Sequence, residues 1–538
     1  MNKKNNIDNI LSKMTLEQKI AQVLCWNVTE TKTEDIKRRF DNLPLGCVFY
    51  GHMTGDEYRE KKNTIEDICE IPVIACADLV NGAGCRIHPP NGGVLFPWQM
   101  ACGAANDEGL VEKMGEAIAI EGREFGVHWT LAPIVDLSIN PLNSMMGTRT
   151  FGEKPEHVIK MAKAFIRGVQ KNGCMAATAK HFPGDGVDDR DSHVCTSVNT
   201  YTREEWENSF GIIWRSMIDS GVLSVMSGHI GLPFIDGGIK AYMGPTPATL
   251  SKKLQIDFLR KELEFEGVIV SDAAPMAGFT SHAKESERAW RTIEAGTDVY
   301  LWADVENDPR WMKEAVIDGK LSEERLNDAV RRVLLLKEQV GLLDKRDVPK
   351  ATKEQKGKYV EYGEEIAKRS ITVIRNEENS LPVQLKSAAK VLTVTWMFGR
   401  GLRGKMEDLK VIDSELENRG FEVRHIVNPT GNQIVEMAPQ FDAVFMNIFV
   451  PPRYGTLRMD SEFANTMWGS FWLDHPCVIF TSFGDPYKIH EMPTVPNMIN
   501  AYSDTPSTQR AAVKVWFGEE KAYGKSPLSL PGFFDIEI

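Results

Sequence analysis

The sequence predicts an α/β protein with two domains: an N-terminal (β/α)8 barrel of the TIM type and a smaller α/β sandwich with an open sheet. The chain has 538 residues, more than one hydrophobic core usually serves. Short apolar runs alternate with longer amphipathic runs over roughly the first 345 residues. A polar, lysine-rich stretch, residues 344–358, then separates these runs from a second series of apolar runs.

Eight short apolar runs in the first part are predicted to be buried parallel strands. They are residues 20–26, 45–51, 72–78, 128–137, 174–182, 222–230, 267–273 and 298–302. Runs with helical spacing lie between most of them, for example residues 108–125 and 153–173, and each ends near a glycine, as helices commonly do. Eight strands separated by helices predict a barrel, although periodicity alone does not distinguish a short apolar strand from a buried helix.

The predicted domain boundaries follow from these patterns. The barrel domain covers residues 1–343, and residues 344–370 form a linker and a connecting helix. Residues 371–538 form the second domain. A first apolar run of this domain begins at residue 371. Further strands are predicted at residues 390–398, 421–427, 441–450 and 475–483.

Composition and charge narrow the class of protein. The formal net charge is -12, which disfavours nucleic acid or an anionic membrane as a partner, because both attract basic surfaces. The polar N-terminus lacks the apolar stretch of a signal peptide, and no apolar run is long enough to span a bilayer. The nine cysteines are scattered and none forms a CxxC pair, which argues against disulfides and structural zinc. We expect a cytoplasmic protein without a cofactor or metal, and a homo-oligomer is compatible with the sequence.

Ionisable side chains collect where the predicted strands end. They are Asp78, Arg86, Asp136, Arg149, Lys180, His181, His229 and Asp272. Catalytic groups of a (β/α)8 barrel lie at the C-terminal ends of its strands, so this set predicts an active site at one rim. Strand ends also border polar loops in any barrel, and buried Asp and His often make purely structural hydrogen bonds. That alternative stays open for Asp136 and His229 in particular.

Asp272 directly follows the apolar run GVIVS at residues 267–271. A carboxylate at the mouth of a barrel can attack the anomeric carbon of a sugar and form a covalent intermediate. The alternative is that Asp272 caps the next helix, since Ser-Asp is a favourable N-terminal cap.

The loop 183–193 combines two glycines with four aspartates and ends at His193. Asp191 stands two residues before His193, and a carboxylate beside an imidazole orients the ring and favours its protonated form. This pair is therefore a candidate proton donor. A cation site is the rival interpretation, but the calcium-loop pattern closed by a glutamate is absent from the loop.

The string KHFPGDGVDDRDSH at residues 180–193 closely resembles the signature of family 3 glycoside hydrolases, in particular of their β-N-acetylglucosaminidase branch. There, KHFPG-x-G is followed by D-S-H. The resemblance spans about residues 15–385 and continues in order through ADLVNGAGCR (77–86), LAPIVDLSINP (131–141), VMSGHI (225–230), FEGVIVSDA (265–273) and AKRSITVIRNEENSLP (367–382). It implies a retaining β-glycosidase that removes terminal β-linked N-acetylhexosamine from a small-molecule carbohydrate.

The resemblance also implies residue roles. Asp272 is expected to be the nucleophile and His193 the general acid/base, paired with Asp191. The residues expected to bind the non-reducing-end sugar are Asp78, Arg86, Arg149, Lys180 and His181, with His229 as a further candidate. Charged donors and acceptors make the strong hydrogen bonds that fix sugar hydroxyls.

Two departures from the family pattern leave the exact sugar open. Val80 stands where the family commonly has an acidic residue, and Asp185 stands where the cytoplasmic glucosaminidases often have histidine. A phosphorylase or a β-glucosidase on the same scaffold therefore remains an alternative. A sugar-binding protein without turnover and a metal-dependent barrel hydrolase are further alternatives. A metal-dependent barrel hydrolase would be expected to have an H-x-H motif in its first strand, and residues 20–26 do not contain one.

A glycine pattern in the second part resembles a nucleotide-binding fingerprint. Gly399, Gly401 and Gly404 form G-x-G-x-x-G just after a predicted strand. The next strand is followed by Asn428 instead of the acidic residue that binds ribose. A glycine-rich turn or an anion-binding nest is therefore favoured over a nucleotide site, and this domain is expected to buttress the barrel.

Overall fold

A computed structural model describes residues 3–66, 68, 71–237, 244–344, 346, 350–377, 380–397, 409–452, 461–468 and 470–530. The chain divides into two compact units. The first comprises residues 1–94, 111–137 and 162–359, and the second comprises residues 95–110, 138–161 and 360–538. Two stretches inside the predicted barrel domain, 95–110 and 138–161, thus group with the C-terminal part of the chain.

The first unit contains a strand in each of the eight predicted runs. The strands are β1 (Leu24–Asn27), β2 (Cys47–Phe49), β4 (Ile74–Ala77), β6 (Trp129–Thr130), β7 (Thr178–Phe182), β9 (Ser224–Ser227), β11 (Val268–Ser271) and β12 (Tyr300–Leu301). They form two parallel sheets, in the orders β12-β1-β2-β4-β6 and β11-β9-β7. Isolated parallel bridges, Trp129 to Ala176 and Val270 to Val299, connect the edges of the two sheets.

The predicted runs extend beyond their strands, and local features explain this in two of them. Residues 20–22 end helix α2 (Leu16–Gln22), whose start is fixed by reciprocal hydrogen bonds between Thr15 and Gln18. In the run 128–137, regular pairing stops after β6 and resumes only as a single bridge at Ile134. Pro133 lies between them and has no N–H to donate to a neighbouring strand.

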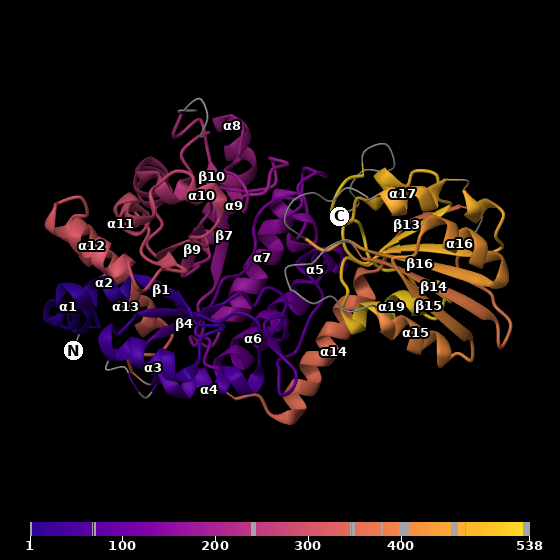
Figure 1. The fold of residues 1–538 in the computed structure, drawn as a ribbon, viewed down its shortest axis with the longest axis horizontal. Coiled ribbons are helices and arrows are strands. Elements are labelled where there is room, and N and C mark those ends of the chain that lie inside the picture. The colour runs from indigo at the N-terminus through magenta and orange to yellow at the C-terminus, as the bar shows by residue number, and fades with distance from the viewer. Residues whose placement is uncertain are drawn as a thin grey trace. The chain divides into compact units, whose positions relative to one another are not determined.

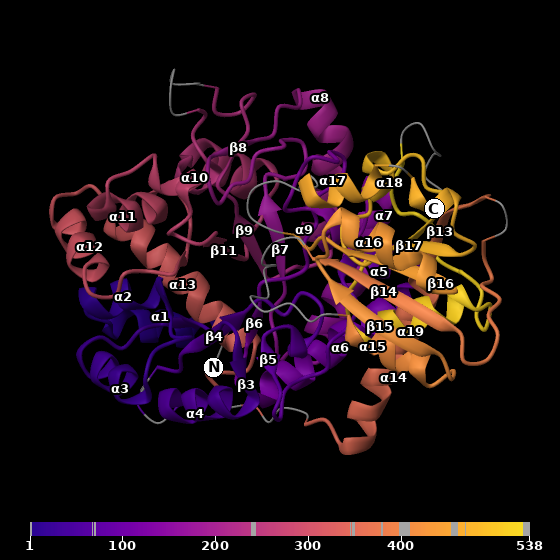
Figure 2. The same ribbon diagram turned by 45° about the vertical axis from the view of Figure 1, so that its right-hand side comes forward.

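Helices alternate with these strands. They include α1 (Lys3–Lys13), α3 (Thr33–Asn42), α4 (Gly55–Glu66), α6 (Glu108–Glu124), α7 (Pro155–Gln170), α9 (Ile212–Asp219), α11 (Glu285–Ala295), α12 (Asp308–Ile317) and α13 (Glu323–Gln339). Figure 2 shows α3, α4, α11 and α12 ranged around the strands. Alternate side chains of the strands, such as Phe49, Trp129 and Val270, share one apolar core with Val333 and Leu336 of α13.

The second unit is built on one six-stranded sheet. Its strands are β13 (Thr372–Asn376), β14 (Lys390–Met397), β15 (Glu422–Val427), β16 (Ala443–Phe449), β17 (Val478–Ser482) and β18 (Asn497–Asn500). Their order is β13-β18-β17-β16-β14-β15, and every pair is parallel except β13 with β18. The sequence pattern does not predict β18, because its four residues NMIN begin and end with asparagine instead of forming an apolar run.

Helices cover both faces of this sheet. Figure 1 shows α16 (Gly431–Met437) and α17 (Ser461–Met467) on one side, and α15 (Lys410–Glu417) and α19 (Pro506–Trp516) on the other. Alternate residues of β16 divide accordingly. Met446 packs in a core with Ile434 of α16, and Phe445 packs in a second core with Leu416 of α15 and Trp516 of α19.

Two further predictions concern the C-terminal part. Helix α14 (Lys353–Ser370) begins inside the stretch predicted as a linker. The glycine pattern at residues 399–404 lies outside the described residues. Within the described part of the chain, none of the helices has the length and apolar character needed to cross a bilayer.

Candidate active site

The first unit brings a carboxylate and two cations together after β4 and within β7. Asp78 follows β4; its Oδ1 accepts a hydrogen bond from Nζ of Lys180 at 2.8 Å, and its Oδ2 accepts one from Nη2 of Arg86 at 3.1 Å. Burial opposes the charge of Arg86, but Asp78, Cys85 and Tyr58 together raise the pKa of the guanidinium. One carboxylate therefore holds both basic side chains in place, as recognition of a polar ligand requires.

Asp136 and His181 form a second pair beside the first. Asp136 is fully buried, and its carboxylate accepts hydrogen bonds from the backbone N–H groups of His181 and Asp185. Nδ1 of His181 lies 2.7 Å from Oδ2 of Asp136, so the ring donates through Nδ1 and keeps Nε2 for another partner. The structural interpretation left open for Asp136 fits its position, because it orients the His181 ring and the loop that follows.

Asp272 lies directly after β11, half-buried, with its backbone N–H bonded to the carbonyl oxygen of Ser227 on β9. Burial favours the neutral acid, but the combined charges of His181, His229 and His193 outweigh it and lower the pKa of the Asp272 carboxyl. Asp272 is thus kept ionised at a point that three imidazoles influence. The alternative role as a helix cap is wrong, because the next helix, α10 (Ala277–Thr280), has Met276 at its cap position.

His229 is fully buried behind this carboxylate. Its Nε2 lies 3.0 Å from the carbonyl oxygen of Ala273 and its Nδ1 lies 2.8 Å from Oγ1 of Thr249. The ring also stacks on Phe279, with centroids 4.9 Å apart. Burial lowers the pKa of His229 despite the nearby charge of Asp272. Both ring nitrogens are engaged within the protein.

In the loop 183–193, the partly exposed side chain of His193 is hydrogen-bonded to the buried carboxylate of Asp191. Nδ1 of His193 lies 2.8 Å from Oδ1 of Asp191, and the His193 backbone N–H donates to the same oxygen at 2.9 Å. The Asp191 side chain is 1% exposed, whereas the His193 side chain is 28% exposed. Because the carboxylate accepts from Nδ1, a proton transfer by this ring would use Nε2.

The backbone of this loop is anchored to the segment that carries Asp272. The carbonyl oxygen of His193 accepts a hydrogen bond from the N–H of Ala277 at 3.0 Å, and Thr196 Oγ1 donates to the carbonyl oxygen of Gly278 at 2.9 Å. A Cβ at Gly278 would come within 2.5 Å of the carbonyl oxygen of Ser192, so only glycine permits this approach. His193 and Asp272 are therefore positioned by one short stretch of chain, residues 272–278.

Arg149 lies in the second unit. It ends the 3₁₀ turn η2 (Gly147–Arg149) and donates from Nη1 to the carbonyl oxygen of Met145 at 3.2 Å. The other predicted site residues, Asp78, Arg86, Lys180, His181, Asp191, His193, His229 and Asp272, lie in the first unit.

Two histidines, His52 and His88, form a hydrogen-bonded group with Arg86, and the sequence pattern does not predict this group. Nε2 of His52 is hydrogen-bonded to Nη1 of Arg86, and Nδ1 of His52 lies 2.8 Å from Nε2 of His88. They come together because two strands of two residues each, β3 (Met53–Thr54) and β5 (Ile87–His88), pair in parallel. Such short strands leave no periodic signal in a sequence.

Among the described residues, the group with the spacing of metal ligands is a trio of cysteines. The Sγ atoms of Cys25, Cys47 and Cys76 lie within 4.8 Å of one another on β1, β2 and β4. All three are fully buried and belong to the apolar core of the first unit, where thiols pack as small hydrophobic groups.

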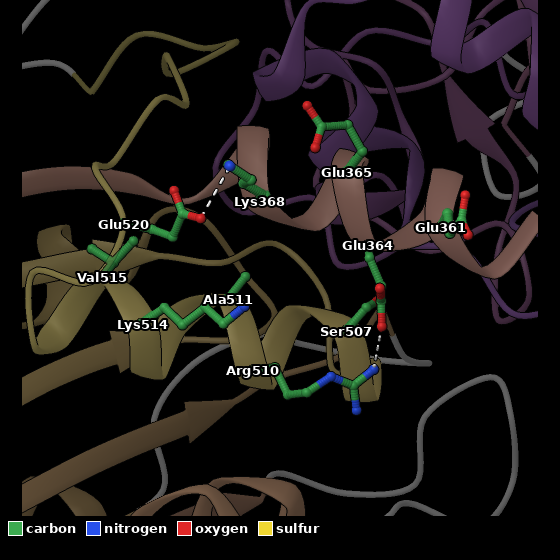
Figure 3. Close-up of a pocket in the computed structure, with 10 residues that line it drawn as sticks. All are labelled: Glu361, Glu364, Glu365, Lys368, Ser507, Arg510, Ala511, Lys514, Val515 and Glu520. Carbon is green, nitrogen blue, oxygen red and sulfur yellow. Dashed lines mark hydrogen bonds and ion pairs between the residues drawn. The ribbon is translucent and has the colours of Figure 1, made fainter. Parts of the chain in front are cut away.

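A groove of about 400 Å³ in the second unit lies between α14 and α19 (Figure 3). Its charged side chains pair across it, Lys368 with Glu520 at 3.0 Å and Arg510 with Glu364 at 3.2 Å. None of the predicted site residues lines it. The groove therefore bears no relation to the predicted chemistry.

Comparisons with known proteins match the chain to a family. Residues 15–336 match the family described as glycosyl hydrolase family 3 N terminal domain. A β-N-acetylglucosaminidase/β-glucosidase of Cellulomonas fimi is 30% identical over 539 residues, which cover 96% of this chain and 94% of that protein.

Two solved structures are similar over nearly the whole chain. One is a β-glucoside phosphorylase, BglX, bound to 2FGlc, with a TM-score of 0.87 and 29% identity, covering 97% of this chain and 96% of that one. The other is a glycoside hydrolase family 3 β-N-acetylglucosaminidase from Paenibacillus sp. str. FPU-7, with a TM-score of 0.85 and 26% identity, covering 96% of this chain and 98% of that one.

Proposed function

Because the chain belongs to glycoside hydrolase family 3, we propose that it is an exo-acting, retaining β-glycosidase that removes terminal β-linked N-acetylhexosamine. The observation that carries the proposal is that residues 272–278 anchor both Asp272 and the loop with the Asp191–His193 pair, and the imidazoles of His181, His229 and His193 lower the pKa of the Asp272 carboxyl against its own burial. A carboxylate held charged beside a partly exposed imidazole has the properties of a nucleophile with its proton donor.

In the proposed first step, a carboxylate oxygen of Asp272 attacks the anomeric carbon, and the bond from that carbon to the leaving oxygen breaks. The proton on Nε2 of His193 passes to the leaving oxygen, so the aglycone departs as a neutral alcohol. Asp191 holds the Nδ1 proton of His193 throughout and stabilises the imidazolium before transfer. The product of the step is a glycosyl ester of Asp272.

In the proposed second step, the roles reverse. His193 is now neutral, with its proton on Nδ1, and its Nε2 takes a proton from a water molecule. The oxygen of that water attacks the anomeric carbon, the ester bond to Asp272 breaks, and the sugar leaves with its original β configuration. The fixed tautomer of His193 suits it to both steps.

We propose that the sugar at the non-reducing end is bound by Asp78, Arg86, Arg149, Lys180 and His181. Asp78 and Lys180 are already oriented by each other, so few side-chain rotations are lost when sugar hydroxyls replace water. His229 is better placed to position residues 272–273 than to contact the sugar, because its two ring nitrogens already have partners.

Phosphorolysis is a second candidate function, favoured by the similarity to a β-glucoside phosphorylase over 97% of this chain. In this variant an oxygen of inorganic phosphate replaces water in the second step, and the product is a sugar 1-phosphate. A neutral imidazole repels an incoming phosphate less than a carboxylate base would. The similarity to a β-N-acetylglucosaminidase/β-glucosidase also extends the candidate sugars to glucose.

A panel of aryl β-glycosides separates these candidates. N-acetylglucosaminide, N-acetylgalactosaminide, glucoside and xyloside are assayed with and without inorganic phosphate. The proposal expects the highest kcat/KM for an N-acetylhexosaminide, with a free sugar as product at every phosphate concentration. Turnover that rises with phosphate and yields a sugar 1-phosphate would establish the phosphorylase, and preference for the glucoside would establish the β-glucosidase. No turnover of any member contradicts all three.

We also propose that the eight strands of the first unit form a closed (β/α)8 barrel and that the second unit is an α/β sandwich. The bridges at both edges of the two parallel sheets support the barrel. The proposed domains are residues 1–343 and 371–538, joined by residues 344–370. A cytoplasmic location stays a proposal and rests on the scattered cysteines.

A further inference from the structure

The small parallel pair β3–β5 fixes His52 beside Arg86. Met53 pairs with Ile87 in the register, and the backbone N–H of Met53 donates to the carbonyl oxygen of Arg86 at 3.1 Å. The residues that precede these two strands, His52 and Arg86, are therefore neighbours through the backbone. The meeting of their side chains follows from the fold and needs no flexible loop.

Arg86, His52 and His88 form a hydrogen-bond chain that permits only one arrangement of protons on the two rings. A guanidinium can only donate, so Nε2 of His52 accepts from Arg86 and carries no proton. His52 must then carry its proton on Nδ1, and it donates that proton to Nε2 of His88 at 2.8 Å. His88 in turn is unprotonated at Nε2. The chain therefore requires both rings to be neutral.

The charges around this hydrogen-bond chain oppose the addition of a proton to His52 or His88. Among the described residues, Arg86 and Lys180 both pair with the carboxylate of Asp78, which gives two positive charges and one negative charge beside His52. Tyr58 and Cys85 also lie within electrostatic range of Arg86. The first turn of α4, which follows β3, contains two acidic residues that have their own partners: Asp56 pairs with Arg59 and accepts from Asn91, and Glu57 accepts from Thr54.

We propose that His52 is a positioning residue that holds the Arg86 guanidinium in its sugar-binding orientation, and that it does so only while neutral. The inference rests on the proposed role of Arg86 in binding the sugar. A proton on Nε2 of His52 replaces the acceptor of Arg86 with a second donor and places two cations in contact. Arg86 then keeps only Asp78, which it shares with Lys180, and affinity for the sugar falls.

Two substitutions separate positioning from a general packing effect. Glutamine at residue 52 can accept from Arg86 through Oε1 and donate to His88 through Nε2, but it does not titrate. Leucine fills similar space and offers no acceptor. With the best aryl glycoside at pH 7.5, His52→Leu is expected to raise KM about tenfold or more with a smaller change in kcat, while His52→Gln stays within about threefold of wild type.

The pH profile gives the sharper readout. As the pH falls from 7.5 to 5, through the range in which histidines ordinarily titrate, kcat/KM of the wild type is expected to decline relative to that of His52→Gln. His52→Gln should lack that part of the decline, because Asp272, with its lowered pKa, stays ionised over this range. His425→Gln, at a histidine that bonds to Thr395 in the second unit, is the control and should follow the wild type.

Equal kcat/KM in wild type and His52→Leu, or an unchanged acid limb in His52→Gln, would overturn the inference. A readout without turnover keeps it separate from the proposed function. Long-range ¹H–¹⁵N spectra of histidine-labelled protein at pH 7.5 should show a neutral Nδ1–H tautomer whose signals vanish in His52→Gln. An Nε2–H tautomer or a charged ring at that position contradicts the inference even if every glycoside is cleaved.

Discussion

Parallel strands in both units are followed by a cluster of charged side chains, and the two clusters differ in how much of them reaches solvent. In the first unit, the side chain of Asp78 is 19% exposed while it holds Arg86 and Lys180. In the second unit, Asp485 follows β17 and pairs with Lys488 at 3.0 Å, and their side chains are 2% and 1% exposed. Both clusters pair an aspartate with a lysine.

The difference teaches that buried ion pairing by itself does not identify a site. The second cluster closes on itself, since Lys488 also pairs with Glu491 at 2.5 Å and the backbone N–H of Tyr487 donates to Asp485. Its polar atoms serve the segment that follows the strand. The first cluster keeps the side chains of Asp78 and Arg86 partly accessible, and Lys180 directly precedes His181, one of the imidazoles that act on Asp272. We therefore expect mutations in the first to change catalysis and mutations in the second to change stability.

The largest effect is expected at the nucleophile. Asp272→Ala should lower kcat/KM by roughly 10⁴-fold or more on every cleaved substrate, because no other group can form the covalent bond. Steady-state kinetics measure the loss, and thermal unfolding should stay close to wild type. Asp189→Ala, at an exposed aspartate of the loop 183–193, is the matched control and should retain wild-type kinetics. Comparable losses in the two variants would contradict the assignment.

The next effect depends on the leaving group. His193→Ala should lower kcat/KM by about 10²- to 10⁴-fold for alkyl glycosides, whose leaving oxygen needs a proton. For a dinitrophenyl glycoside the loss should be about tenfold or less, since that leaving group departs as an anion. A series of substrates with graded leaving-group pKa measures the slope. A loss of the same size across the series would remove His193 from the acid/base role.

The second cluster should respond in the opposite way. Asp485→Ala leaves the buried Lys488 with Glu491 as its acidic partner, and it should lower the free energy of unfolding by about 3 kcal/mol while kcat/KM stays near wild type. Urea denaturation measures the stability. Asp474→Ala, at an exposed position of the same unit, should change it by less than about 0.5 kcal/mol. A large loss of kcat/KM in folded Asp485→Ala would erase the distinction between the clusters.

The smallest effect is expected at Glu121, a buried carboxyl of the first unit whose pKa is raised. Burial raises the pKa of Glu121 on α6 to about 7, although its carboxylate accepts from the N–H of Val94 at 2.9 Å. The folded protein thus keeps a proton that the unfolded chain loses near pH 4.5, so stability falls as the pH rises from 4.5 through 7.

Glu121→Gln removes that dependence and keeps an oxygen for Val94. It should be more stable than wild type by about 2–3 kcal/mol at pH 8, and the difference should vanish below pH 4.5. Urea denaturation at both pH values measures the difference. Glu116 lies on the same helix as Glu121 and forms a surface ion pair with Lys171. The control variant Glu116→Gln removes that pair and should show no such trend. A constant or inverted difference at Glu121 would contradict a raised pKa.

The sequence predicts much of the first unit because its signals are local. Each of the eight apolar runs contains a strand, and α6 and α7 occupy the two runs with helical spacing. Strand lengths were harder to predict, since they depend on a helix cap at Thr15 and on Pro133. Strand β18 has no apolar run and depends on pairing with β13 and β17.

The site was only partly predictable for a related reason. Asp191 and His193 are two residues apart, and the structure pairs them. The chain from Arg86 through His52 to His88 joins residues up to 36 positions apart through two-residue strands, which no spacing reveals. The engagement of both nitrogens of His229 likewise depends on Thr249 and Ala273, which tertiary packing brings to it.

Trapping the covalent intermediate tests the central claim most directly. The protein is incubated with an activated fluorosugar whose fluorine slows both steps and whose leaving group restores the first, and the labelled peptide is identified by mass spectrometry. The account predicts a single sugar adduct, formed in proportion to lost activity and located on Asp272. An adduct on another residue, or turnover through a path that never places a sugar on Asp272, would contradict it.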